Sequence, residues 1–179
     1  MTTIDERIGE DWNGLSRTSV EWMKKQIDVI NMMKENPKED IDLIGLSAML
    51  NNLIYDMEVD AKFTVEQLMS DLVALVITRD LHFTRYYQID ARNTLHVMYC
   101  KYREENRDYL KKLVEEDLQV LYERAINDYR NNAFMNEDLD RSKFALLPKE
   151  VPWTMDEILD KGVNDLVDML IEAMDKNKD

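Results

Sequence analysis

The chain has 179 residues, of which 45% are hydrophobic and 34% are charged, and its formal net charge is −14 at pH 7. This is the composition of a globular protein that can bury a sizeable core in one domain, and it excludes a disordered chain. The negative charge argues against direct nucleic-acid binding and against binding to an anionic membrane surface. No N-terminal stretch has the pattern of a secretory signal, and no apolar run is long enough to span a membrane.

Four Thr-x-x-Glu/Gln patterns predict helix starts and therefore an all-α fold. In each, the Thr hydroxyl can accept from the backbone N–H three residues on, while the Glu or Gln reaches back to the Thr N–H. Only 4 Gly and 3 Pro occur, which leaves few turns and favours long helices. The four patterns are Thr3–Glu6, Thr18–Glu21, Thr64–Gln67 and Thr154–Glu157.

Apolar periodicity predicts the helices in chain order. A first amphipathic helix covers residues 19–36, and a second covers 40–58. A third, over 65–87, is apolar on more than one side and is the expected central core helix. Residues 89–132 contain no Pro or Gly. They therefore form either one very long helix or two helices with a break near the polar stretch 103–108.

The remaining chain predicts a loop followed by one more helix. Residues 133–153 are rich in turn-forming and acidic residues and are interpreted as a connection, with Trp153 fixing it to the core. A C-terminal helix covers 154–177. The predicted architecture is a single all-α domain over 1–179, with its core in about 16–132. It is a bundle of about five helices with one long or kinked central helix, and the C-terminal helix packs back on it.

The C-terminal helix has two contrasting faces. An apolar stripe runs from Leu159 to Met174 and has to be buried against the bundle or against another subunit. Together with the long 89–132 run, this stripe predicts a homo-oligomer, most simply a dimer. The opposite face is acidic and is the predicted binding site for a basic protein partner, unless it is a plain solvated surface. Its residues, which we expect to be exposed, are Asp165, Asp168, Glu172 and Asp175.

A second candidate site lies in the locally basic stretch 79–103. Arginines and tyrosines together could bind a phosphate, a nucleotide or an acidic partner. The alternative is that the arginines pair with carboxylates of the same chain. The candidate residues are Arg79, Arg85, Arg92, Tyr86 and Tyr87.

Patterns for metal binding or catalysis are weak. His96 and Cys100 stand four apart and would share a helix face, but a zinc site needs further ligands. The acidic alternation Asp56–Asp60 lacks the Gly and the distal Glu of a calcium loop. Glu105–Asp108 has the Glu-x-x-Asp spacing of helical nucleotide pyrophosphatases, but their Glu-x-x-Glu partner is missing. We therefore expect no cofactor and no metal.

The leading hypothesis is a non-enzymatic acidic interaction protein, a regulatory, accessory or assembly factor that binds a protein partner. Its single cysteine, Cys100, fits a reducing, cytoplasmic compartment. One alternative is an inhibitor whose carboxylates imitate nucleic-acid phosphates and occupy a nucleic-acid enzyme. Another is a metal-dependent hydrolase built on scattered carboxylates. Size, charge and the lack of catalytic motifs also suit an accessory protein of a virus or mobile element.

Overall fold

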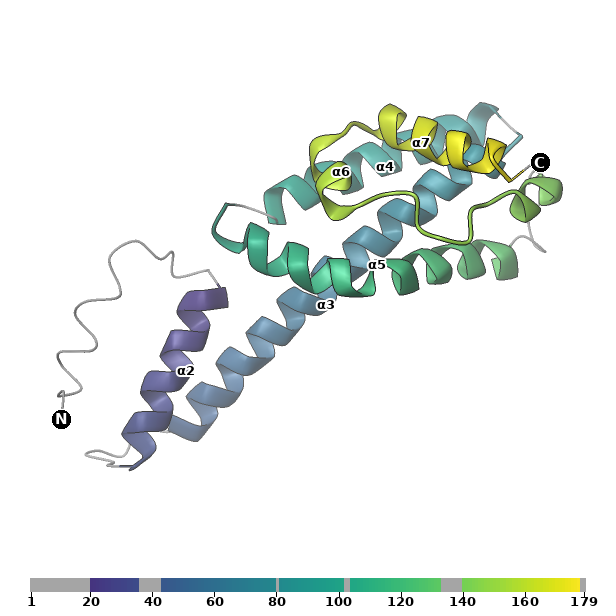
Figure 1. The fold of residues 1–179 in the computed structure, drawn as a ribbon. Coiled ribbons are helices and arrows are strands. Elements are labelled where there is room, and N and C mark those ends of the chain that lie inside the picture. The colour runs from purple at the N-terminus through teal and green to yellow at the C-terminus, as the bar shows by residue number, and fades with distance from the viewer. Residues whose placement is uncertain (1–19, 36–42, 80, 102–103, 133–139, 178–179) are drawn as a thin grey trace.

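The structure, a computed structural model, is an elongated all-α molecule with a long central helix (Figure 1). It describes residues 20–35, 43–79, 81–101, 104–132 and 140–177. The predicted helix starts at Thr3 and Thr18 lie outside these ranges. None of the described helices combines the length and the apolar character that crossing a lipid bilayer requires. The elements are α2 (Val20–Glu35), α3 (Leu43–Ile77), α4 (Leu81–Lys101), α5 (Glu104–Asn132), the 3-10 helix η1 (Arg141–Ala145), α6 (Met155–Asp160) and α7 (Val163–Asp175).

The central helix α3 is a single rod of 35 residues, where the sequence predicted two helices and a new start at Thr64. Thr64 does not cap a helix. It is buried within α3, and its hydroxyl donates to the Asp60 carbonyl oxygen at 2.7 Å. A mid-helix Thr can satisfy its hydroxyl on the preceding turn in this way, so the helix continues. The predicted third helix also ends earlier than expected, at Ile77, and α4 begins at Leu81.

The long stretch 89–132 is two helices. The chain leaves α4 after Lys101 and enters α5 at Glu104, at the polar stretch where a break was one of the two predictions. α4 runs back along α3, and α5 then runs in the same direction as α3 (Figure 1). Ion pairs follow this shared direction, since Lys62 meets Asp117 at 2.6 Å and Glu66 meets Arg124 at 3.9 Å.

The main core surrounds the second half of α3. Side chains from α4, α5, α6 and α7 cover most of this half, together with Leu147 and Trp153 from the segment before α6, and Gln67 stays exposed. Burial on more than one side explains why the sequence is apolar on more than one side here, as predicted for the central core helix. The α3 residues with 0% exposure are Val65, Leu68, Met69, Leu72, Val73, Ala74 and Ile77.

The segment that precedes α6 is held against the bundle by hydrogen bonds. At its start, the backbone N–H of Asp140 donates to the carbonyl oxygen of Ile77 at 2.8 Å. Further along, the Gln119 side chain donates to the Lys149 carbonyl oxygen and accepts from the Val151 N–H, both at 2.9 Å. The described part of the predicted loop is therefore fixed at the end of α3 and along α5.

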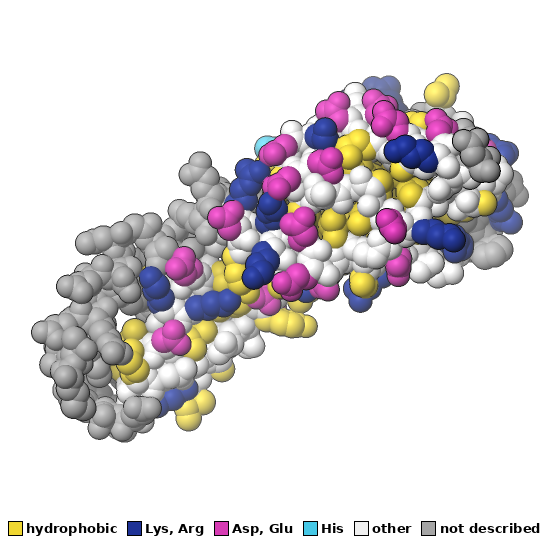
Figure 2. All heavy atoms as spheres, viewed as in Figure 1, with side chains coloured by type: hydrophobic (Ala, Val, Ile, Leu, Met, Phe, Trp, Pro, Cys, Tyr) yellow, Lys and Arg dark blue, Asp and Glu magenta, His cyan; other side chains and the backbone are white. Residues whose placement is uncertain are grey.

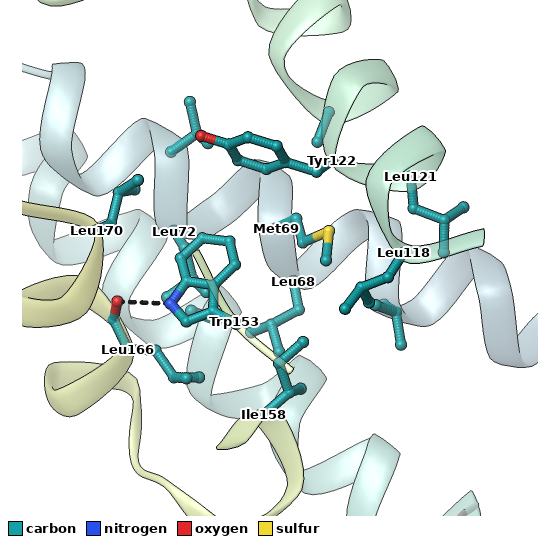
Figure 3. Close-up of a cluster of buried hydrophobic side chains, with 14 of the residues drawn as sticks. Leu68, Met69, Leu72, Leu118, Leu121, Tyr122, Trp153, Ile158, Leu166 and Leu170 are labelled. Atoms are coloured by element: carbon teal, nitrogen blue, oxygen red, sulfur yellow. Dashed lines mark hydrogen bonds between the residues drawn. The ribbon is translucent and has the colours of Figure 1, made fainter. Parts of the chain in front are cut away.

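Trp153 anchors this segment in the core, which confirms the prediction. The side chain is 2% exposed, and its Nε1–H donates to the Leu166 carbonyl oxygen at 2.9 Å (Figure 3). Its ring meets the Tyr122 ring edge-on, with the centroids 5.8 Å apart. One side chain thus connects the segment before α6 to both α5 and α7.

The predicted single C-terminal helix is in fact two, α6 and α7. The capping box that opens α6 is present as predicted: the Thr154 hydroxyl accepts from the Glu157 N–H at 3.3 Å, and the Glu157 carboxylate accepts from the Thr154 N–H at 2.9 Å. After one and a half turns, Lys161 and Gly162 adopt extended backbone conformations. Gly162 then serves as the N-cap of α7, so the two helices meet at an angle set by this pair.

Beyond the bundle, α2 and residues 43–63 of α3 form a two-helix arm (Figure 1). α2 is the first amphipathic helix that the sequence predicted. Its contact with α3 makes a small second core around Val20, Met23 and Ile54. At the root of the arm, the Asn106 side chain of α5 accepts the backbone N–H of Val20 at 3.0 Å, which caps the start of α2.

Replacing Trp153 tests its role as the anchor of the segment before α6. Trp153→Ala should lower the free energy of unfolding by about 3–5 kcal/mol, because it removes a fully buried ring. Trp153→Phe keeps a ring but leaves the Leu166 carbonyl without its donor, so it should cost less, about 1–2 kcal/mol. Urea unfolding, followed by far-UV circular dichroism, measures the free energy of unfolding of both variants. Trp22→Phe is the control, because Trp22 is a half-buried tryptophan in the arm. Equal losses for Trp153→Ala and the control would contradict the anchor role.

Candidate functional site

The acidic face of α7, formed by Asp165, Asp168, Glu172 and Asp175, is exposed as predicted. In the view of Figure 2, acidic side chains are spread over the bundle, including the side where α7 lies, with Lys and Arg side chains between them. The apolar stripe from Leu159 to Met174 is buried in the chain's own core. This stripe therefore does not supply the free surface on which the predicted oligomer was based.

The four carboxylates of the acidic face are not equivalent. Asp165 belongs to the start of α7, because its Oδ2 accepts the backbone N–H of Gly162 at 3.2 Å. A carboxylate in the first turn is also favoured by the helix dipole. Asp168 and Glu172 lie one turn apart, and their carboxylates make no ion pair or hydrogen bond with any residue that the structure describes. Asp168 and Glu172 are therefore the carboxylates most available to a partner.

Two carboxylates of the neighbouring helix α6, unlike those of Asp168 and Glu172, form ion pairs. Asp156 pairs with Lys111 at 2.6 Å, and Asp160 pairs with Arg107 at 3.0 Å. Basic side chains of α5 thus neutralise the acidic side of α6. Among the described residues, the α7 carboxylates without an ionic partner, Asp168 and Glu172, therefore do not continue as a row onto Asp156 and Asp160 of α6.

The structure does not bring the predicted arginines together. Arg79 follows α3 and pairs with Asp140 at 2.8 Å, and this hydrogen bond lowers the pKa of Asp140 to about 2. Arg79 therefore has the internal partner that the alternative interpretation expected. Arg85 and Arg92 are exposed, share one face of α4, and form no ion pair with the described part of the chain.

The two predicted tyrosines belong to a different neighbourhood. Tyr87 packs edge-on against Tyr86 and Tyr129, with ring centroids 5.5 and 5.9 Å away. Tyr86 is exposed, and its hydrogen bond to Asp90 raises the pKa of its hydroxyl. Tyr86 and Tyr87 therefore border a polar cluster between α3, α4 and α5, and do not form one site with the arginines.

An open pocket of about 450 Å³ lies between α4 and the start of α7. Its walls include Arg92, His96 and Tyr99 from α4 and residues 162–165. An arginine beside a helix N-terminus is a common anion site. Here, however, the carboxylate of Asp165 already accepts the backbone N–H at that helix end. The pocket thus contains its own anion, and we assign no phosphate site to it.

No three His, Cys, Asp or Glu side chains converge on a common point within the described ranges. The thiol of Cys100 and Nε2 of His96 are 4.0 Å apart, and both residues are exposed. The acidic alternation Asp56–Asp60 lies on the continuous helix α3, whereas a calcium loop needs irregular backbone. The side chain of Glu105 lies outside the described residues.

A buried carboxylate, Asp71, is a feature that the sequence analysis missed. It is 3% exposed, and Gln67 donates to its Oδ1 at 3.3 Å, while its Oδ2 has no partner among the described atoms. Burial is the main cause that raises the pKa of Asp71 to about 7, with a smaller contribution from the negative charge of nearby Asp90, against the hydrogen bonds from Gln67 and Thr94. The signal in the sequence was an acidic residue inside the apolar run of the central core helix.

The second missed feature is an apolar surface on the arm. The sequence predicted a second helix with apolar residues over 40–58, and of the apolar side chains described in 43–58 only Ile54 is buried. The sequence signal was the lack of any charged residue from Leu43 to Tyr55. We call this surface the apolar arm face. Its large side chains, which are 40–74% exposed, are Ile44, Leu46, Met49, Leu53, Tyr55, Val59 and Phe63.

Comparison of the chain with protein-family models, with curated proteins and with solved structures found no match. The function is therefore argued from the surfaces of the chain itself. Two of them, the acidic face and the apolar arm face, lie at opposite ends of the elongated molecule (Figures 1 and 2).

The buried carboxylate predicts a stability that falls as the pH rises. The folded-state pKa of Asp71 is raised from 3.8 to about 7. Its contribution is therefore fully present below about pH 4 and is lost as the pH rises to 7. Between pH 5 and pH 8 the free energy of unfolding should drop by about 2–3 kcal/mol. Asp71→Asn should remove this drop and be more stable than wild type at pH 8.

Urea unfolding at several pH values measures this effect. Asp56→Asn is the matched control, because Asp56 is an exposed aspartate on the same helix. The control should keep the slope of the wild-type protein. If the free energy of unfolding changed with pH equally in Asp71→Asn and in wild type, the pKa of Asp71 would be the same in the folded and unfolded states, which would contradict the prediction.

Proposed function

We propose that this protein is a non-enzymatic interaction protein that binds a basic protein partner through the acidic face of α7. The observation that carries the proposal is that the carboxylates of Asp168 and Glu172, on a firmly packed helix, have no ion pair or hydrogen bond with any described residue. Like charges one turn apart destabilise a helix by a few tenths of a kcal/mol. The bundle neutralises the carboxylates of α6 and leaves these two, which is the arrangement that a basic partner would use.

The acidic face is supported by a rigid base. The apolar stripe of α7 from Val163 to Met174 is buried, and the Leu166 backbone is bonded to Trp153. A helix fixed in this way presents Asp168 and Glu172 about 6 Å apart along its axis. Because the face is already ordered, a partner does not have to offset the entropy of ordering it.

Charge favours an acidic docking surface over direct nucleic-acid binding. The net charge of −14 attracts a basic protein over long range and raises its association rate. Imitation of nucleic-acid phosphates is a narrower form of the same proposal. It has less support, because the unpaired row stays on one helix and the carboxylates of α6 are paired with Lys111 and Arg107.

The proposal includes a role as a regulatory, accessory or assembly factor in the cytoplasm. Cys100 is a free, exposed thiol. Exposed free thiols persist most readily in reducing compartments, where disulfides are rare. This supports an intracellular site of action for the interaction.

Neutralising the two unpaired carboxylates tests the proposal. Affinity purification from the source cell with wild-type protein supplies the partner, and surface plasmon resonance then measures association. Asp168→Asn with Glu172→Gln should slow association about tenfold at low salt, because rim charges act through steering. The difference should shrink as salt rises, since exposed charges are screened beyond about 10 Å at 0.1 M.

A charge-matched control separates the site from the overall charge. Asp28→Asn with Glu116→Gln changes the net charge equally, at two exposed positions outside α7. This variant should retain nearly the association rate of wild type. Equal rates for both double variants, or binding that salt does not affect, would contradict a role for the acidic face.

A further inference from the structure

The two helices of the arm have outer faces of opposite character. α3 exposes the apolar arm face, on which Ile44 is 74% exposed and Tyr55 is 64% exposed. α2 is a complete amphipathic helix, whereas α3 exposes apolar side chains in addition to those that it packs against α2. The described residues exposed on α2 are all polar, and they are Glu21, Lys24, Asp28, Asn31 and Lys34.

The apolar arm face is as large as the functional patches of single chains. The aromatic side chains Tyr55 and Phe63, each roughly 150–250 Å² when fully exposed, are 64% and 62% exposed. Ile44 and Val59, which lie on the same side of α3, are 74% and 46% exposed. These four side chains leave an apolar patch on the order of 500 Å², within the roughly 300–600 Å² of the largest patch on a typical protein, which is often functional. In Figure 2, apolar side chains protrude from the arm.

Part of the face forms a stripe along the helix. Between Ile44 and Phe63, successive stripe positions are separated by four, four, three, four and four residues. This spacing is slightly longer than the helical repeat of about 3.6 residues, so the stripe drifts by about 100° around the axis between its two ends. It is about 28 Å long. The stripe positions are Ile44, Ala48, Asn52, Tyr55, Val59 and Phe63.

Charge points to a second copy of the chain as the occupant. A protein with net charge −14 repels its own copies wherever acidic surfaces meet. From Leu43 to Tyr55, however, α3 carries no charged residue. Two copies can therefore approach through this face without bringing like charges together.

The stripe also favours one orientation of the two copies. Asn52 and Tyr55 flank the midpoint of the stripe. Asn52 is the polar one of the two, and in an antiparallel pair with its two-fold axis at this residue it meets its own copy. An amide both donates and accepts, which lets two Asn side chains pair in an apolar contact. Antiparallel pairing sets Asp56 of one copy beside Ala48 of the other. Parallel pairing would oppose two Asp56 carboxylates.

We propose that a second copy of this chain covers the apolar arm face, through antiparallel pairing of the two α3 helices about a two-fold axis near Asn52. This self-association uses a different surface from the binding of a basic partner and does not depend on it. In the dimer, the two arms overlap and the two bundles point away from each other.

Sedimentation velocity on the full chain tests the proposal. Wild-type protein should have twice the mass of one chain at micromolar concentration. Tyr55→Glu should raise the dissociation constant of the dimer more than tenfold, because each copy would bury an unpaired carboxylate near the axis. Asn31→Glu is the matched control, since it adds the same charge to the exposed polar face of α2. This control should remain a dimer, and circular dichroism should show unchanged helix content in both variants.

Cross-linking tests the orientation in a Cys100→Ser background. A short bismaleimide should link Asn52→Cys chains into dimers, because the two thiols meet at the axis. It should not link Ile44→Cys chains, whose thiols would lie about 24 Å apart along the axis. Asp28→Cys, on the polar face of α2, should not link either. Links at Ile44→Cys as well as at Asn52→Cys would overturn the antiparallel arrangement.

A wild-type mass of one chain would overturn self-association, whether residues 1–19 of the same chain or another protein then covers the face. Tyr55→Glu dimers as stable as wild type would overturn the assigned surface. The Asp168→Asn, Glu172→Gln variant should remain dimeric. The mass measurements therefore test self-association, and the association rates with the basic partner test the acidic face, independently of each other.

Discussion

The length of α3 determines the architecture of the whole molecule. A helix satisfies its own backbone and rises 1.5 Å per residue, so 35 residues make a rod of about 52 Å. The rod continues through its middle because Thr64 returns its hydroxyl to the Asp60 carbonyl. Its second half lies inside the bundle. Among the described residues, its first half has α2 beside it and meets α5 near Glu58, whose carboxylate accepts from the Tyr109 hydroxyl. One side of α2 cannot cover an α3 segment that is apolar on two sides, and the exposed face follows from this mismatch.

The molecule divides its surface by charge as well as by shape. The bundle pairs Asp156 and Asp160 of α6 with basic residues of α5, whereas Asp168 and Glu172 of α7 have no ionic partner among the described residues. At the other end, the arm presents a stretch of α3 without charge. Ionic strength therefore acts on one end of the molecule and hardly on the other. The two proposed contacts rest on different forces and can be strengthened or weakened independently.

Interactions within one helical turn were predictable from the sequence, whereas the packing of one helix against others was not. The capping box at Thr154 was identified correctly because all its atoms lie within one turn. The same pattern at Thr64 failed because a Thr inside a helix can bond backward, which a sequence pattern does not reveal. Exposure of the acidic face followed from the opposite apolar stripe. Exposure of Ile44 and burial of Asp71 depend on how many helices surround each half of α3, and periodicity reports only which side of a helix is apolar.

The two halves of α3 lie in different surroundings, the arm and the bundle, so they should open with different free energies. Amide protons of residues 65–77 lie in the main core, and their exchange with solvent requires unfolding of the whole bundle. Amide protons of the arm depend on a core centred on Val20, Met23 and Ile54, so they exchange through a smaller opening in which α2 separates from α3. Hydrogen exchange would therefore divide the continuous hydrogen-bonded ladder of α3 into a slow and a fast half. Because a bound second copy stabilises only the closed arm, the fast half alone would slow as the protein concentration rises.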